Sequence, residues 1–225
     1  MNEKIEIGNF INKCRFLARN GLVDGRKSII PEIKFIAIPF GTFVGTPNNP
    51  AIFVTQRTYK LYSNIPSLVD LNIVEDATIL IKEQFIQNNH SIALLGVIAH
   101  EMGHAFNVTS NLYPNTEENA CIFEIGTLLR LYREDSWFMN IRLSKENLTE
   151  YFKSRISNYT KTTSNRILVK LVEYILNPAS DFMFSPFMPK TKSSSTLFAN
   201  TPSPKTQTLF LAETGDTPAS NISKL

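Results

Sequence analysis

The strongest constraint on the fold of this chain is the segment IALLGVIAHEMGHAFN, residues 92–107. Its apolar residues suit a buried helix, yet the segment also contains His100, Glu101 and His104. Burying two imidazoles and a carboxylate is costly unless each of them has a partner. The chain has only 3 histidines, and two of them stand in this segment. The segment therefore predicts a buried helix whose polar side chains share a common partner.

A single metal ion is the partner that best explains the spacing. Residues four apart on an α-helix lie on the same face, so His100 and His104 are able to offer two nitrogens to one zinc ion at about 2.0–2.1 Å each. Glu101 is rotated off that face and can take a proton from metal-bound water. Gly103 and Ala105 keep the helix surface thin, so that a substrate or a second helix can approach. Two separately hydrogen-bonded core histidines are the alternative.

The third zinc ligand has to come from elsewhere in the chain. A catalytic zinc usually has three protein ligands and leaves a fourth position to water. His90 lies near the start of the same helix, about 15 Å from His100 along the axis, so we exclude it. Residues 116–135 form the next predicted helix, and Glu117 and Glu124 both fall within its apolar stripe. A glutamate on a buried helix face needs a cation, so either one is a candidate ligand.

Together these motifs resemble the gluzincin-type HEXXH zinc metallopeptidases, in which a helix bearing a ligand glutamate follows the HEXXH helix. The family often shows a glutamate, two residues, a small residue and then a polar one. The segment EENAC, residues 117–121, matches at Glu117 and Ala120 and departs at Cys121. On this resemblance Glu117 is the favoured third ligand, and Glu124 remains the alternative. The resemblance covers roughly residues 33–135.

The same resemblance implies a fold and a set of catalytic roles. It implies a zincin-like fold, Zn²⁺ as the cofactor, and an edge strand within residues 33–45 or 51–62 that pairs with an extended substrate. It also implies a donor that stabilises the oxygen of the scissile carbonyl. The candidates for that donor are Tyr113, Tyr132, Tyr151, Tyr159 and Arg155.

Hydrophobic periodicity and turn residues predict an α+β fold that is mainly helical. Residues 33–45 and 51–62 are expected to form a small antiparallel pair of strands, joined by a turn rich in Pro and Asn. Helices are expected over 1–22, 74–89 (with TILI, 78–81, as an alternative strand), 90–107 after an Asn89 cap, 116–135, 144–159 after a Ser144 cap, and 164–177 from a Ser164 cap to Pro178.

The chain is expected to hold one zincin-like domain and a tail. The domain is placed at residues 1–184, with a helical C-terminal part from about 136. Residues 185–225 are rich in Ser, Thr and Pro and contain one apolar island, TLFLA, at 208–212. This composition is typical of a disordered or partner-docking tail.

Composition narrows the function classes. A net charge of +3 gives no concentrated basic face for nucleic acid. The longest apolar run is too short to span a bilayer, and the N-terminus has no apolar core of a signal peptide. We therefore expect a monomer in the cytoplasm, or a protein that reaches a host cytosol without such a signal. Cys14 and Cys121 are expected to be buried, reduced thiols.

Two functions fit these features. The first is a zinc-dependent endopeptidase acting on a protein substrate. The chain's size, its motif and its high Asn, Ile, Lys and Phe content also resemble the RavK-like effector proteases of Legionella, which makes host actin a testable substrate. The second is a catalytically inert zincin-fold module that binds a partner through its C-terminal tail. The intact Glu101 favours the first, since a structural zinc site needs no unliganded carboxylate.

Overall fold

The structure is a computed structural model, and it describes residues 3–22, 25–39, 49–88, 92–138, 140–161 and 165–177. Within these ranges the fold is α+β and mainly helical, as the sequence predicts. The tail, the boundary at 184 and 185, the Asn89 and Ser164 caps, Pro178 and His90 all lie outside the described residues. No helix among those described is both long and apolar enough to cross a membrane.

A three-stranded mixed sheet forms the β part of the fold. Its strands are β1 (Lys34–Ile38), β2 (Ala51–Val54) and β3 (Thr78–Lys82). The order is β1-β3-β2, with β3 parallel to β1 and antiparallel to β2. The strand β2 is therefore an edge strand. The predicted antiparallel pairing of β1 with β2 is wrong, because β3 lies between them.

Two predicted elements in this region change type. Residues 51–62 do not form one long strand, because Thr55 caps the helix α2 (Gln56–Ser63) with a capping box that includes Thr58. Residues 74–89 are not one helix either. The alternative strand TILI is β3, and the short helix α3 (Glu83–Asn88) follows it. A 3₁₀ helix, η1 (Pro66–Leu71), lies between α2 and β3.

The strand β3 is apolar on both faces because it separates two hydrophobic clusters. Ile79 and Ile81 belong to the main core, whereas Leu80 belongs to a smaller cluster on the other face of the sheet. Tyr62 of α2 and Leu68 of η1 cover that smaller cluster. A run that is buried on both faces has no period-two alternation, which is why its sequence was ambiguous between helix and strand.

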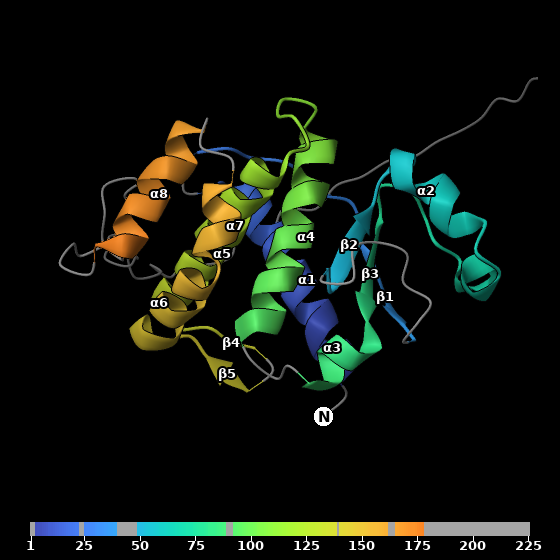
Figure 1. Cartoon of the computed structure of the whole chain (residues 1–225), viewed down its shortest axis with the longest axis horizontal. Coiled ribbons are helices and arrows are strands. Elements are labelled where there is room, and N and C mark those ends of the chain that lie inside the picture. The colour runs from blue at the N-terminus through green and yellow to red at the C-terminus, as the bar shows by residue number, and fades with distance from the viewer. Residues whose placement is uncertain are drawn as a thin grey trace, which may run out of the picture. The chain divides into compact units, whose positions relative to one another are not determined.

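The main core is built around two long helices, α4 (Ile92–Ser110) and α5 (Glu117–Arg133). Figure 1 shows α4 between the sheet and α5, with α1 (Glu3–Asn20) behind it, and both α1 and β2 contact α4. The helix α4 ends where Asn111 adopts a left-handed φ of 52°. Thr116 then caps α5 by accepting a hydrogen bond from the backbone N–H of Asn119.

Within the described residues, three further helices and a short hairpin follow α5. The hairpin strands are β4 (Trp137–Phe138) and β5 (Ile141–Arg142), which the sequence did not predict. Ser144 caps α6 (Lys145–Ser154) as predicted, but the helix breaks at Arg155 and continues as α7 (Ile156–Thr160). Asn165 caps α8 (Arg166–Leu176). Both cysteines, Cys14 and Cys121, are buried free thiols, as predicted.

Candidate metal centre

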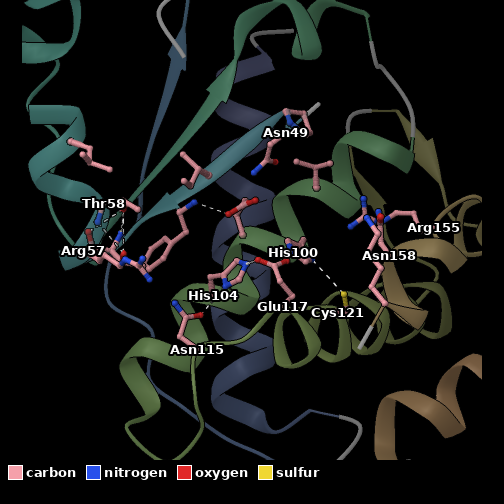
Figure 2. Close-up of a pocket in the computed structure, with 18 residues that line it drawn as sticks. Asn49, Arg57, Thr58, His100, His104, Asn115, Glu117, Cys121, Arg155 and Asn158 are labelled. Atoms are coloured by element: carbon pink, nitrogen blue, oxygen red, sulfur yellow. Dashed lines mark hydrogen bonds and ion pairs between the residues drawn. The ribbon is translucent and has the colours of Figure 1, made fainter. Parts of the chain in front are cut away.

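The facing ends of α4 and α5 bring two histidines and a glutamate together. His100 Nε2 lies 3.1 Å from a carboxylate oxygen of Glu117, and His104 Nε2 lies 3.4 Å from the other oxygen. One ligand atom from each of the three residues falls within 4.8 Å of the other two. Figure 2 shows both imidazoles and Glu117 close together among the residues that line a cleft. This grouping is able to hold a metal ion.

Glu117 does not occupy the buried face that the helical pattern predicts. Its side chain is 73% exposed, because it stands in the first turn of α5 at the edge of the cleft. Glu124, two turns later, is fully buried. The two carboxylates that the sequence leaves open as ligands therefore differ in surroundings, one facing the cleft and the other facing the core.

Glu124 has several partners of its own inside the core. It accepts hydrogen bonds from the hydroxyls of Tyr159 at 2.6 Å and Tyr151 at 2.8 Å, and it forms an ion pair with Arg155 at 3.1 Å. Its Oε2 lies 3.0 Å from Nδ1 of His100. Because these donors occupy its oxygens, Glu124 is suited to orienting His100 rather than to binding an ion.

Both histidines are held by their Nδ1 atoms. Nδ1 of His100 faces Glu124, and Nδ1 of His104 lies 2.8 Å from the side-chain oxygen of Asn115. With Nδ1–H donating to these oxygens, Nε2 of each ring is directed at Glu117. Metal-binding histidines are commonly oriented in this way by an acceptor on the second nitrogen.

Hydrogen bonding also sets the charge state of this cluster in the absence of metal. Burial lowers the pKa of His100, but hydrogen bonds to Cys121, Glu117 and Glu124 outweigh it and leave that pKa well above its usual value. Burial likewise opposes protonation of His104, and Glu117 and Glu101 raise its pKa. Hydrogen bonds from both histidines hold the pKa of Glu117 below its usual value.

A second possible grouping lies deeper, where His100, Cys121 and Glu124 each offer a ligand atom. The Cys121 sulfur lies 4.0 Å from Nδ1 of His100. Burial raises the pKa of this thiol, which disfavours the thiolate that binds metals. Glu124 already pairs with Arg155, so a cation there would meet a positive charge. The cleft-facing grouping is the better metal site on both counts.

Glu101 lies beside the histidines and contacts the edge strand. It is 4% exposed, lines the cleft, and accepts a hydrogen bond of 2.6 Å from the backbone N–H of Phe53 in β2. This contact links the sheet to the carboxylate that the motif assigns to proton transfer. Nothing in the sequence pattern indicated that a backbone group of β2 would hold it.

The cleft itself is an open cavity of about 940 Å³ between α2 and β2 on one side and α5 and α7 on the other. Of the five predicted donors to a carbonyl oxygen, only Arg155 lines it. Tyr151 and Tyr159 point at Glu124, Tyr113 stacks on Phe106, and Tyr132 packs at the edge of the core. Comparison of the chain with known protein families, curated proteins and solved structures finds no match.

Proposed function

We propose that this protein is a zinc-dependent endopeptidase that hydrolyses peptide bonds in a protein substrate. The observation that carries the proposal is the convergence of His100 Nε2, His104 Nε2 and the Glu117 carboxylate at one point of an open cleft, with Glu101 beside them. His100, His104 and Glu117 are the proposed zinc ligands. Glu101 is the proposed general base.

The donor set and its spacing fit zinc. Two imidazoles and one carboxylate are a common catalytic zinc set. Two ligands about 2.0–2.1 Å from a tetrahedral ion stand roughly 3.3 Å apart. The two distances between Nε2 and carboxylate oxygen, 3.1 and 3.4 Å, are close to that separation. Three ligands also leave one position for water or substrate.

The chemistry follows from the roles of the residues around the site. Bound zinc supplies polarisation of the scissile carbonyl and activation of water. Glu101 accepts a proton from the attacking water and delivers it to the leaving amine, acting first as base and then as acid. Phe53 N–H holds one oxygen of Glu101 and leaves the other available for this transfer. Arg155, at the cleft wall, is the proposed donor to the developing negative charge.

A polypeptide substrate is supported by the outer edge of β2, with which no other strand of the described residues pairs. The carbonyls of Pro50 and Val54 accept hydrogen bonds from the β3 side of the sheet. Because backbone groups alternate in direction along a strand, those of Ala51 and Phe53 point outward. Glu101 holds the N–H of Phe53, which leaves the Phe53 carbonyl and the groups of Ala51 for a substrate. An extended chain can pair with this edge, which borders the cleft. We therefore propose β2, rather than β1, as the substrate-binding strand.

The test compares wild type with Glu101→Gln in a cell lysate, with and without a zinc chelator, and purified actin forms a separate arm. We expect a chelator-sensitive cut made by wild type, and a loss of at least about 100-fold in Glu101→Gln. Glu101→Gln should still bind zinc, since Glu101 is not a ligand. Full activity of that variant would overturn the proposal. Zinc binding without any cleavage would favour the inert binding module. If actin is not cleaved while another protein is, only actin is excluded as the substrate.

A further inference from the structure

The negatively charged residues of the cleft lie at the candidate metal centre, and the positively charged residues lie around it. Glu101 and Glu117 lie with the histidines in the middle, and the other charged lining residues are the cations Arg57, Arg155 and Lys161. Figure 2 shows Arg57 on one side of His100 and His104, and Arg155 and Asn158 on the other. Lys161 caps the C-terminus of α7 with a helical backbone and follows Asn158 by three residues, which puts both on the same face.

Two of these cations are not neutralised by any residue that the structure describes. Arg155 is paired with the buried Glu124. The side chains of Arg57 and Lys161 are exposed and have no hydrogen bond or ion pair with any residue that the structure describes. Their positive charges are therefore available to a bound molecule from opposite walls of the cleft.

Arg57 also occupies a position that a helix disfavours for a cation. It is the second residue of α2, and the first turn of that helix contains no acidic residue. The partial positive charge of a helix N-terminus opposes cations there and favours anions. The backbone N–H of Gln56 at this helix end already donates to the carboxylate of Asp76 at 3.3 Å, so a carboxylate brought beside Arg57 would be stabilised by the Arg57 side chain itself.

The net charge of the cleft with a divalent metal ion bound also favours an acidic ligand. Counting Glu124, three carboxylates balance the three cations in and under the cleft. A divalent ion at the proposed centre would then leave two excess positive charges. An acidic segment is the complement of such a surface, whereas a basic one would be repelled.

We infer that the cleft selects a protein segment with acidic side chains on both sides of the bond to be cut, and that Arg57 and Lys161 select them. This inference rests on the proposed function, because it specifies the substrate of that site. Arg57 forms an ion pair with the substrate carboxylate on the α2 side of the cleft. Lys161 forms an ion pair with the substrate carboxylate on the α7 side. The apolar Ile52 and Val97 also line the cleft.

The test measures binding separately from cleavage. Zinc-loaded, full-length Glu101→Gln is immobilised and offered a pool of ten-residue peptides in which each position is Glu, Gln or Lys in turn. Bound peptides are quantified by mass spectrometry. We expect enrichment of Glu over Gln of about two- to fivefold per side, the range of an exposed ion pair. The enrichment should fall near about 1 M salt, where the screening length is about 3 Å.

Charge-reversal variants assign each preference to a wall. Arg57→Glu should convert the preference for Glu into one for Lys at one end of the peptide, and Lys161→Glu should do so at the other end. Lys60→Glu is the matched control, because it makes the same charge change on α2 but lies outside the cleft lining. Both target side chains are exposed, so the variants should fold, and their zinc content verifies this.

The outcomes separate this inference from the proposed function. Equal binding of Glu and Gln peptides, no peptide binding at all, or a change in Lys60→Glu as large as in Arg57→Glu would overturn the inference. Cleavage by wild type without an acidic preference would also overturn it while leaving the endopeptidase intact. Acidic preference in binding with no cleavage by wild type would overturn the endopeptidase and would support only the acidic binding preference of the cleft, without a bond to be cut.

Discussion

Glu124 is the residue on which the geometry of the site depends most. It is completely buried, and its two oxygens meet His100, Arg155 and two tyrosine hydroxyls. A carboxylate buried without such partners would be protonated. Here His100 and Arg155 outweigh burial and keep the pKa of Glu124 below its usual value. The anion in turn fixes the ring of His100.

Removing one donor to Glu124 should destabilise the fold. Tyr159→Phe deletes the shortest hydrogen bond to that carboxylate, and we expect unfolding to become easier by about 2 kcal/mol, as for hydrogen bonds to charged groups. Tyr132→Phe is the control. Tyr132 is partly buried but its hydroxyl makes no hydrogen bond within the described residues, so losing that hydroxyl should cost less than about 0.5 kcal/mol. Urea denaturation measures the free energy of unfolding of both variants. Equal losses in the two variants would contradict the assigned hydrogen bonds to Glu124.

The histidines should make the stability of the metal-free protein depend on pH. Their pKa values are raised above the ordinary 6.5, so their contribution is fully present below about pH 6.5 and is lost as pH rises through the folded pKa. The pKa values of Glu117 and Glu124 are lowered from 4.5, so their contribution is present above about pH 4.5 and is lost as pH falls through the folded pKa. The combined contribution is greatest between these values.

The measurement is the free energy of unfolding of chelator-treated protein across pH. The difference between wild type and His100→Gln isolates the cluster from other titrating groups. We expect this difference to shrink steadily above about pH 6.5. A difference that grows between pH 7 and pH 9 would contradict the assigned charge states.

At the scale of elements, the contact between α4 and α5 sets the distance between the ligands. A Cβ atom on Gly103 would lie 2.8 Å from both the Cα and the carbonyl oxygen of Ala120, and 3.0 Å from Cβ of Phe123. The two helices therefore approach each other backbone to backbone at the middle of the motif. The sequence predicted such an approach by a substrate or a second helix, and the second helix is what the fold brings there.

Gly103→Ala should push the two helices apart. We expect a loss of about 1–3 kcal/mol from overpacking, together with weaker zinc binding, because Glu117 moves away from the histidines with α5. Gly8→Ala is the matched control. Gly8 lies inside α1 with nothing within 4 Å of an added Cβ, so alanine should be neutral or stabilising by up to about 1 kcal/mol. Unchanged stability and zinc affinity in Gly103→Ala would contradict the close contact.

The helices were more predictable than the strands, for a physical reason. The segments of α1, α4, α5 and α8 repeat their apolar residues every three or four positions, which is a local signal. The position of β3 between β1 and β2 depends on pairing between segments far apart in sequence. No local pattern encodes that order. The polar caps Thr116 and Ser144 act within one turn, and Ser144 was predicted as a cap for this reason.

At the scale of the whole molecule, the sequence indicated which residues approach one another but not what holds them. His100, Glu101 and His104 follow from a five-residue spacing on one helix. Their supporting partners come from separate elements: Asn115 from a loop, Tyr151 and Tyr159 from α6 and α7, and Phe53 from the sheet. A single sequence contains no spacing rule that relates these positions. The sequence did show that Cys121 departs from the gluzincin pattern, and the Cys121 side chain lies next to His100 in the fold.

Zinc should stabilise the folded protein as a whole. A ligand that binds only the folded state raises the free energy of unfolding by about 2.7 kcal/mol at 100 times its dissociation constant. We expect zinc to raise the melting temperature of wild type and Glu101→Gln, but not of His104→Ala. Differential scanning calorimetry with and without zinc measures this. If zinc raised the melting temperature of His104→Ala as much as that of wild type, the zinc ion would have to bind at another site.

The central claim is that one zinc ion binds where α4 and α5 meet. X-ray absorption spectroscopy on purified, untagged, zinc-reconstituted protein, combined with metal analysis, tests it most directly. The expected result is one zinc per chain with two nitrogen ligands and carboxylate oxygen at about 2.0–2.1 Å, and loss of one nitrogen in His104→Ala. Less than stoichiometric zinc after reconstitution, or a sulfur ligand from Cys121, would contradict the claim.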